Sequence, residues 1–355
     1  MKLGAWTPLP HTIRPEARMT KAIEELGSRS LSPKIDESFL FVVDFIQQAE
    51  NCGFDITLIA ERFLGPDLES WVLASALAMK TKSIELMVAV HPGIINPQVA
   101  AKMGATLDRI SGGRLAINVV NGWWEEEFNI FGNGSWLASS DKRYQRMSEF
   151  MQTMRGLWTD DEFTAIGEFF PVKQARLPIR TLRQPSPPVY AASQAPAGKE
   201  AIARYGDVWF IQQQSTFRDF NTALEQAHSA IEEMQMLSAK YGRRVGVGLS
   251  GHVICTRTME EATRLATELE QYGKGGTVSF VAATGLTAAL VGTPELIAER
   301  LDRYREIGVE VTMLHFHPMI DGLAHFAEEV LPLLNWKAGL QLKGNQPAST
   351  RDQCR

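Results

Sequence analysis

Four histidines lie in or directly after apolar runs of strand type: His91, His252, His315 and His317. Histidine is the usual general acid or base near neutral pH, so this placement favours proton transfer. The histidines belong to separate strands, and neither H-E-x-x-H nor H-x-x-E-H occurs, so no metal site is predicted. We expect His91, His252 or His317 to polarise a substrate or to move protons. For His252, the alternative is a hydrogen-bonded histidine of the core.

Two further polar residues stand at predicted strands. Glu61 follows the strand 56–60 and can serve as an acid or a base, or pair with the neighbouring Arg62. Asn118 interrupts the apolar strand 115–120. A buried amide needs hydrogen-bond partners, so Asn118 is either a structural residue of the core or part of a ligand site.

An arginine–tyrosine pair, Arg143 and Tyr144, is predicted to open the helix 143–157 after a polar loop that ends at Asp141. A helix N-terminus with a nearby arginine binds phosphate well, so the pair is a candidate phosphate site. The alternative is a solvent-exposed helix start.

Tryptophans near the predicted strand ends are candidates for the wall of a substrate pocket. Such side chains bury a large apolar area, whether they face a ligand or fill the core. The candidates are Trp6, Trp71, Trp123 and Trp124.

These residues are placed by strands that alternate with helices along the chain. Strands are predicted at 2–6, 56–60, 84–90, 115–120, 189–192, 208–211, 245–255 and 311–315. Helices are predicted at 39–52, 71–81, 98–110, 143–157, 198–205, 217–241, 258–272, 294–307 and 323–334. This alternation argues for an α/β fold with a parallel sheet, and eight strands are the number of a (β/α)₈ TIM barrel. Such a barrel brings all strand carboxyl ends to one face, where active sites lie.

The composition argues against several classes of protein. The chain has 355 residues and a net charge of −5, so neither a nucleic-acid nor an anionic-membrane partner is expected. No apolar run is long enough to span a bilayer, and no signal peptide is visible. The three cysteines are scattered without a disulfide or zinc pattern, which fits reduced thiols in the cytoplasm.

Four sequence blocks carry a resemblance to a known family. They are 105–114 (ATLDRISGGR) with the following N-V-V-N-G-W, the helical block 141–158, the segment 163–170 with Gly167, and 289–301. In this order the blocks resemble the bacterial-luciferase-like family of flavin-dependent monooxygenases. The resemblance is to its two-component branch in particular, which includes alkanesulfonate, dimethyl sulfone and pyrimidine monooxygenases.

The resemblance implies the same (β/α)₈ barrel and a two-component monooxygenase. Such an enzyme takes reduced FMN from a separate NAD(P)H:FMN reductase and uses O₂ as co-substrate. It oxygenates a small molecule through a flavin peroxide. A homodimer or homotetramer is implied as well.

The resemblance also implies where the flavin binds. The matching positions are Ala60, Glu61, Asn118, Glu127, Arg143 and Tyr144. Glu127 belongs to the acidic run 125–127, which a solvent-exposed helix face would also show. The phosphate loop departs from the family, because Ser193 and Gln194 remain but Ala195 replaces a serine. Helix N–H groups there can still bind phosphate, and modest affinity suits an enzyme that borrows reduced flavin.

Charge at the matching substrate positions predicts a neutral substrate. Alkanesulfonate monooxygenase has an arginine where this chain has Ser250 and another in its closing loop, whereas 273–299 contains none here. His317 replaces its active-site tyrosine. Because arginine suits sulfonates best, the site should prefer a small, neutral organosulfur compound such as a sulfone, with C–S cleavage. The alternatives are a pyrimidine-type, C–N-cleaving oxygenase, an alkanesulfonate monooxygenase, an F420-dependent dehydrogenase, or a barrel that binds flavin without catalysis.

A single domain is predicted over 1–335. Two segments depart from the βα repeat. Residues 9–33 follow the first strand and are predicted to form a lid-like insertion. Residues 273–287 match a mobile insertion that closes over the flavin in the family. Residues 336–355 are predicted to be a polar tail, partly disordered.

Overall fold

The computed structural model describes residues 1–9, 36–65, 67–122, 124–132, 134–273 and 285–337. Trp123, most of the predicted lid-like insertion, most of the 273–287 insertion and most of the predicted tail lie outside these residues.

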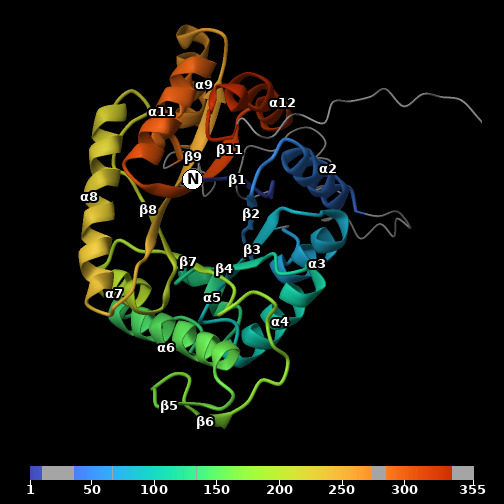
Figure 1. Cartoon of the computed structure of the whole chain (residues 1–355), viewed down its shortest axis with the longest axis vertical. Coiled ribbons are helices and arrows are strands. Elements are labelled where there is room, and N and C mark those ends of the chain that lie inside the picture. Colours follow the sequence, from blue (N-terminus) through green and yellow to red (C-terminus); the bar gives the residue numbers. More distant parts are fainter. Residues whose placement is uncertain (10–35, 66, 123, 133, 274–284, 338–355) are drawn as a thin grey trace, which may run out of the picture.

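Eight parallel strands close into a barrel, which confirms the predicted fold (Figure 1). Around the barrel they are β1 (Lys2–Trp6), β2 (Ile56–Ile59), β3 (Glu85–Val90), β4 (Leu115–Val119), β7 (Val189–Ala192), β8 (Val208–Ile211), β9 (Gly246–Cys255) and β11 (Val309–Phe316). Pairing of β8 with β9 and of β11 with β1 closes the ring. We call the face at the strand carboxyl ends the barrel mouth and the opposite face the barrel floor.

Helices surround the barrel (Figure 1): α2 (Glu37–Asn51), α3 (Ser70–Lys80), α4 (Pro97–Ile110), α6 (Ser140–Thr159), α7 (Pro196–Tyr205), α8 (Phe220–Ala239), α9 (Met259–Gly273), α11 (Pro294–Glu306) and α12 (Met319–His325). The predicted bounds agree to within a few residues, with two exceptions. Because α6 begins at Ser140, Arg143 lies in its first turn and does not open it. The predicted helix 323–334 is the end of α12, followed by a π-helical turn (Phe326–Val330) and a 3₁₀ turn (Leu331–Leu333). No helix in the described part of the chain has the length and apolar character needed to cross a membrane.

Several short elements are not predicted by the sequence pattern: α5 (Glu125–Asn129), the antiparallel pair β5 (Phe163–Ala165) and β6 (Val172–Ala175), the 3₁₀ turn η1 (Leu286–Ala288) and β10 (Val291–Gly292). The carboxylate of Glu149 on α6 fastens the β5–β6 pair by accepting the backbone N–H groups of 168–170. A Cβ at Gly167 would collide with this carboxylate, which explains the glycine of the 163–170 block.

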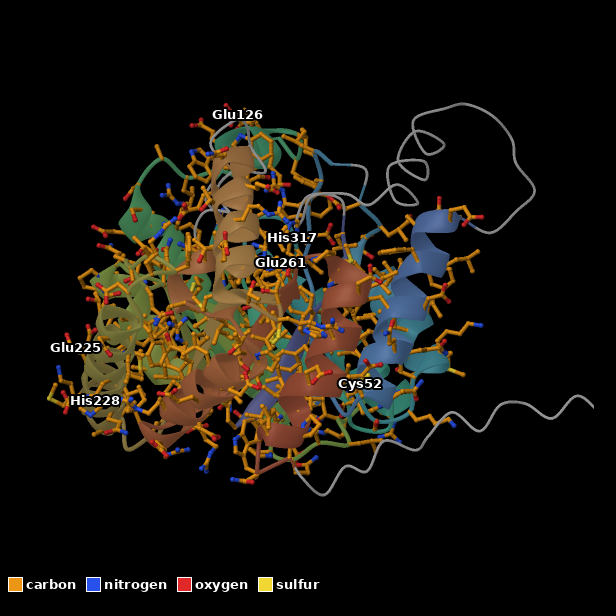
Figure 2. All side chains as sticks on the ribbon, turned by 90° about the horizontal axis from the view of Figure 1, so that it is seen from above. Cys52, Glu126, Glu225, His228, Glu261 and His317 are labelled. Carbon is orange, nitrogen blue, oxygen red and sulfur yellow. The ribbon has the colours of Figure 1, made fainter. Side chains whose placement is uncertain are left out.

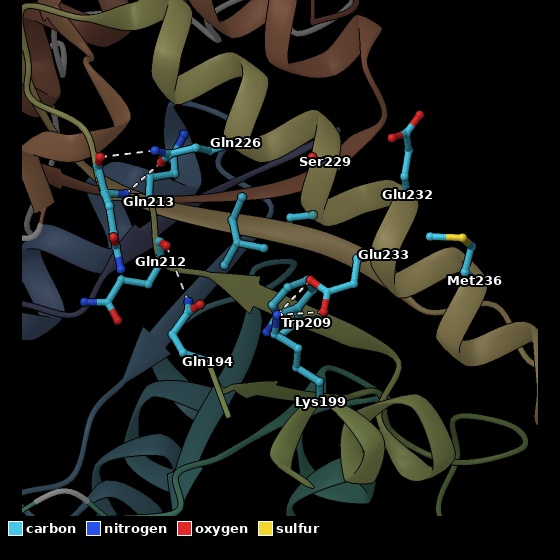
Figure 3. A pocket seen from close by; sticks show the side chains of 13 residues that line it. Gln194, Lys199, Trp209, Gln212, Gln213, Gln226, Ser229, Glu232, Glu233 and Met236 are labelled. Carbon is cyan, nitrogen blue, oxygen red and sulfur yellow. Dashed lines mark hydrogen bonds and ion pairs between the residues drawn. The ribbon is translucent and has the colours of Figure 1, made fainter. Parts of the chain in front are cut away.

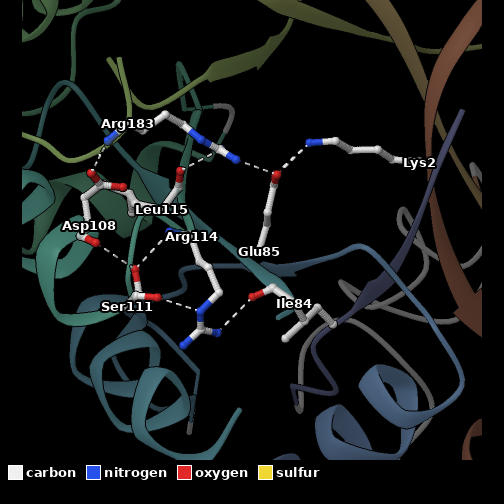
Figure 4. Close-up of polar contacts among 8 residues, drawn as sticks. All are labelled: Lys2, Ile84, Glu85, Asp108, Ser111, Arg114, Leu115 and Arg183. Carbon is white, nitrogen blue, oxygen red and sulfur yellow. Dashed lines mark hydrogen bonds and ion pairs between the residues drawn. The ribbon is translucent and has the colours of Figure 1, made fainter. Parts of the chain in front are cut away.

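The turn between α4 and β4 explains the composition of the ATLDRISGGR block. Gly112 and Gly113 have φ values of +73° and +85°, a region that glycine adopts without steric cost. The following Arg114 donates from Nε to the Ser111 carbonyl at 2.7 Å and from Nη1 to the Ile84 carbonyl at 3.0 Å (Figure 4). The block therefore ends a helix and fastens the next strand beside β3.

Alternating side chains fill the inside of the barrel. One buried cluster consists of residues at every second strand position: Ile56, Leu58, Met87, Ala116, Tyr190, Val208, Phe210, Val311 and Met313. The intervening residues face the helices in a second, larger cluster. Trp6 packs against the inner cluster, and Asn118 shares the inward parity of Ala116 on β4. The predicted residues Trp6 and Asn118 thus face the interior just above a packed apolar layer.

Ion pairs close the barrel floor. Glu85, which begins β3, binds Lys2 Nζ and Arg183 Nη2, each at 2.7 Å (Figure 4). Burial alone would raise the pKa of Glu85, but hydrogen bonds and charges from Arg183 and Lys2 outweigh it, so the pKa is lowered. The carboxylate is therefore kept ionised by its partners.

The first two residues of the predicted tail pack against the barrel floor. Trp336 Nε1 donates to Asp302 at 2.6 Å, and Lys337 Nζ donates to Asp55 at 2.5 Å. The first two side chains of the predicted tail thus find acidic partners on the barrel.

Candidate active site

Three aromatic rings stack in a column at the mouth. Trp6 of β1 and His315 of β11 have centroids 4.3 Å apart with planes inclined by 23°. His315 and His252 of β9 have centroids 4.8 Å apart, inclined by 32°. Trp6 Nε1 donates to Ser250 Oγ at 2.9 Å. The structure thus brings together two predicted residues, Trp6 and His252, through a histidine that the prediction noticed but did not place in the site.

His317 lies beyond the column. It follows β11, is half-buried, and its backbone N–H donates to the Val253 carbonyl at 3.2 Å. Figure 2 shows it toward the middle of the molecule, whereas His228 lies at the outer edge on α8.

The end of the predicted 273–287 insertion packs onto the column. A Cβ at Gly285 would collide with the His252 ring, and one at Gly251 would lie 2.7 Å from Ala288 Cβ. Gly285 precedes η1, whose residue Leu286 is buried. Residues 285–287 are therefore a packed turn beside β9, while 274–284 lie outside the described residues.

His91 occupies the other side of the mouth, after β3. It is 5% exposed, and the Phe128 ring meets it edge-on at 5.6 Å. Burial lowers the pKa of His91, while the charge of Glu127 and the carbonyls of Glu61 and Val120 act in the opposite direction. Neither ring nitrogen makes a hydrogen bond of ordinary geometry with the described residues. His91 is therefore a buried imidazole that lies near the carbonyls of Glu61 and Val120.

Asn118 on β4 and Asn121, shortly after it, carry two further buried acceptor atoms. Asn118 pairs in register with Ala89 of β3, so it lies beside the strand that leads to His91. The Oδ1 atoms of Asn118 and Asn121 are both enclosed and lack a hydrogen-bond partner among the described residues. Unsatisfied buried acceptors are costly, and a bound molecule with N–H or O–H groups would satisfy them.

The Glu61 carboxylate contacts the start of α3. Its Oε2 accepts the N–H of Ser70 at 2.8 Å, at the first residue of α3. Burial raises the pKa of Glu61 to about 7, although hydrogen bonds from Ser70 oppose the shift. Arg62 Nε, next to Glu61 in the sequence, binds Glu127 Oε1 of α5 at 2.9 Å. Ala60, one residue earlier, is buried.

Glu127 differs from its neighbours in the acidic run. It is 2% exposed and also accepts the N–H of Phe63 at 2.8 Å, whereas Glu125 and Glu126 are exposed. Its partner Arg62 stacks on Trp124, with Cζ 4.5 Å from the ring centroid. Glu127 is thus a buried anchor for the loop after β2 and not part of an exposed helix face.

The structure separates the Arg143–Tyr144 pair. A Cβ at Gly198, near the start of α7, would collide with Ser193 Oγ and with the Tyr144 ring, so these three residues meet at one point. Ser193 Oγ also accepts the N–H of Ala195 at 3.1 Å, and no side chain caps α7. Gly198, the Ser193 hydroxyl and the N-terminus of α7 together suit a phosphate group.

Arg143 faces the loop before α6 instead. Its Nη1 donates to the Leu137 carbonyl at 2.5 Å and to the Ala138 carbonyl at 3.1 Å. Its Cζ lies 4.3 Å from the centroid of the Trp136 ring.

Arg146 was missed by the sequence reasoning. It is 4% exposed and donates to the carbonyls of Gly134 and Ser135, each at 2.8 Å. Burial and then the charge of Arg143 lower the pKa of Arg146. No acidic side chain of the described residues pairs with Arg143 or Arg146. The sequence could have indicated Arg146 by its position three residues after Arg143, which puts both on the same side of the helix.

The remaining predicted residues lie farther from the column. Gln194 Nε2 donates to the Gln212 carbonyl at 3.4 Å and lines a groove of about 530 Å³ between α7 and α8 (Figure 3). Lys199 there is paired with Glu233. Trp71 is 6% exposed within the large core cluster. In the described part of the chain, no group of three or more His, Cys, Asp or Glu side chains could hold a metal ion.

Comparison with known proteins identifies the family of the chain. The family model "Luciferase-like monooxygenase" matches residues 19–311. The FMNH(2)-dependent dimethylsulfone monooxygenase of Pseudomonas putida is 29% identical over 338 residues, which cover 85% of this chain and 90% of that protein. The protein of the same name from Pseudomonas fluorescens (strain Pf0-1) is 28% identical over 321 residues, covering 81% and 85%.

Among solved structures, EDTA monooxygenase from Chelativorans sp. BNC1 superposes with a TM-score of 0.74 at 20% identity, covering 96% of this chain and 95% of that one. At this identity the likeness establishes the barrel and nothing of the substrate. Because the family model covers most of the chain, the protein belongs to the luciferase-like monooxygenase family.

Proposed function

We propose that the protein is an FMNH₂-dependent monooxygenase that oxygenates a small, neutral organosulfur compound of the sulfone type and cleaves a C–S bond. The observation that carries the proposal is the similarity, along most of the chain, to proteins named dimethylsulfone monooxygenases. When bound, reduced FMN would supply the reaction with O₂; the protein would bind it, orient it and exclude water.

The residues at the mouth fit this cofactor. Ser193, Gly198 and the start of α7 suit the phosphate, with Tyr144 beside them. The open acceptor of Asn118 suits an N–H edge of the flavin ring. The enclosed nitrogens of His91 lie on the neighbouring strand, where they can hold or pass a proton.

Local charge also supports an anionic cofactor. Arg62, Arg143 and Arg146 approach this side of the mouth, and Glu127 is the acidic partner of Arg62 alone. The whole chain carries a net charge of −5, so this excess of guanidinium groups is a local feature. A positive field in a largely buried site favours the phosphate of FMN.

The β9 side of the mouth supports a neutral substrate. Ser250 uses its hydroxyl to accept the Trp6 indole N–H, so it holds an apolar wall in place. The wall continues through the rings of His315 and His252. A sulfone has polarised oxygens but no net charge, which such a wall of rings and imidazole donors can accommodate.

Two partners belong to the proposal. A separate NAD(P)H:FMN reductase would deliver the reduced flavin. A second copy of the chain would cover α3, whose outer face carries Val72 and Met79 at 71% and 74% exposure. Seven residues apart, these two share one helix face. Light scattering of the wild type and of a Val72→Glu, Met79→Glu variant tests this, and a wild-type monomer would contradict it.

An anaerobic fluorescence titration tests the cofactor first, with oxidised FMN, reduced FMN and F420 as ligands. Preference for reduced FMN is expected, and preference for F420 would favour the dehydrogenase alternative. Turnover with reduced FMN and O₂ then follows on dimethyl sulfone, methanesulfonate and uracil. Sulfinate release from the sulfone alone is expected. Oxidation of uracil would favour the C–N-cleaving alternative, and flavin binding without turnover would favour a non-catalytic barrel.

A further inference from the structure

We propose that His315 is a positioning residue that fixes the orientation of the His252 ring. The inference rests on the proposed function, because it concerns a residue of the same site. It begins with strand register: His315 and His252 are direct partners on the parallel strands β11 and β9. Side chains at paired positions of parallel strands project to the same side of the sheet. On the other flank, Ala5 pairs with Leu314, so Trp6 comes beside His315.

The ring of His315 has flat neighbours on both faces. Trp6 lies 4.3 Å away on one side and His252 lies 4.8 Å away on the other, with small inclinations between the planes. Turning the His315 ring about its Cβ–Cγ bond would bring it against Trp6, on which it stacks, or against His252, which is tilted by 32°.

The His252 ring is held from two directions. His315 covers one face, and the backbone at Gly285 approaches so closely that a Cβ there would collide with the ring. His252 is 2% exposed. Removing the His315 ring would leave a void on one side of His252, into which the imidazole can turn.

The column is closed by a hydrogen bond. Trp6 is fixed by its 2.9 Å bond to Ser250, which lies two residues before His252 on the same strand. The contacts through Trp6 and His315 therefore begin and end on β9. Which imidazole nitrogen of His252 meets the substrate is set by ring orientation, and small misplacements of a reacting group reduce turnover strongly.

The test compares His315→Ala, His315→Phe and His315→Leu with His228→Ala. Phenylalanine keeps a flat ring without nitrogens, and His228 is an exposed histidine on α8 that serves as the matched control. Long-range ¹H–¹⁵N spectra of the imidazoles, with His252 assigned by the loss of its signals in His252→Ala, report orientation in the purified protein without substrate. The His252 signals should shift or broaden in the Ala and Leu variants and stay near their wild-type positions in the Phe and His228 variants. Unchanged His252 signals in His315→Ala and His315→Leu would overturn the inference.

Turnover of dimethyl sulfone gives the second readout. His315→Ala should lower kcat at least tenfold while the Kd for reduced FMN stays within twofold, and His315→Phe should recover most of that loss. His252→Ala with His315→Ala should be no slower than His252→Ala alone, because one residue acts through the other. If His315→Phe were as slow as His315→Ala, the imidazole itself would be needed and a positioning role would be wrong. A wild type without sulfone turnover would contradict the proposed function, and the spectra would still decide the inference.

Discussion

The two ends of the barrel differ in whether their polar groups have partners within the protein. At the floor, Glu85 has two cationic partners, and Asp207 likewise binds Arg155 and Arg243. At the mouth, the enclosed Oδ1 atoms of Asn118 and Asn121 lack hydrogen-bond partners among the described residues.

The difference separates stability from ligand binding. A floor whose charges are paired holds the strand starts together and offers nothing to a ligand. Buried acceptors without hydrogen-bond donors destabilise the mouth until a bound molecule supplies those donors. Substitutions of the paired groups at the floor should therefore act on unfolding, and substitutions of the open acceptors at the mouth should act on binding.

The largest effect is expected from Glu85→Gln at the floor. It leaves Lys2 and Arg183 without their shared carboxylate and should lower the free energy of unfolding by about 3 kcal/mol, measured by urea denaturation. Affinity for reduced FMN should not change. Glu310→Gln, which removes an exposed floor partner of Arg244, is the control and should cost less than about 1 kcal/mol. A loss of flavin affinity in Glu85→Gln would break the comparison.

The two buried glutamates should respond to pH in opposite directions. Burial raises the pKa of Glu61 from 4.5 to about 7, so stability from this group is full below 4.5 and is lost as pH rises through about 7. The partners of Glu85 lower its pKa, so its contribution is present above the unfolded value and is lost as pH falls through the folded one.

Glu61→Gln tests the pH dependence of stability expected from Glu61. Glutamine keeps an acceptor for the Ser70 N–H without a charge, so the variant should gain on the order of 2 kcal/mol over the wild type between pH 5 and 8. Thermal unfolding across this range provides the measurement, with exposed Glu125→Gln as the control. Parallel curves for Glu61→Gln and the wild type would contradict the assigned pKa.

Asn118→Ala should weaken binding of reduced FMN at least tenfold, about 1.4 kcal/mol, because it removes an acceptor for the flavin ring. The free energy of unfolding should change by less than about 1 kcal/mol, since the amide oxygen has no partner to lose within the described part of the chain. Anaerobic titration measures the affinity, and Asn51→Ala at the exposed end of α2 is the control. Equal affinity for the flavin would remove Asn118 from the site.

Ser193→Ala gives the smallest and most specific expected effect. It removes the hydroxyl beside Gly198 and should weaken FMN about threefold, roughly 0.7 kcal/mol. Riboflavin, which has no phosphate, should bind as before. Ser229→Ala in the groove between α7 and α8 serves as the control. If riboflavin weakened equally, the phosphate would lie elsewhere.

The barrel could be predicted because its signals are local and repeated. Each predicted strand is an apolar run, and glycines such as Gly112 end helices for a conformational reason that the sequence displays. The inward placement of Trp6 and Asn118 follows from the period of two along a strand.

The site was harder to predict because its contacts join distant segments. That Arg62 binds Glu127, 65 positions further along the chain, depends on how the loop after β2 packs on α5. Arg143 and Tyr144 are adjacent in sequence, but successive helix positions point about 100° apart, so they reach different loops. His315 lies in the column through pairing of strands 63 positions apart in the chain, which no local pattern reveals.

The packed apolar layer inside the barrel lies above the ion-paired floor, so the mouth is the end at which a ligand can enter. Tyr190 and Phe210 stack across the lower part of the barrel, between the ion pairs and the ring column. On the proposed function, flavin, substrate and products would all enter and leave through the mouth, so the component that binds deepest would arrive first and leave last. The fold itself would impose a compulsory kinetic order, visible in the pattern of product inhibition.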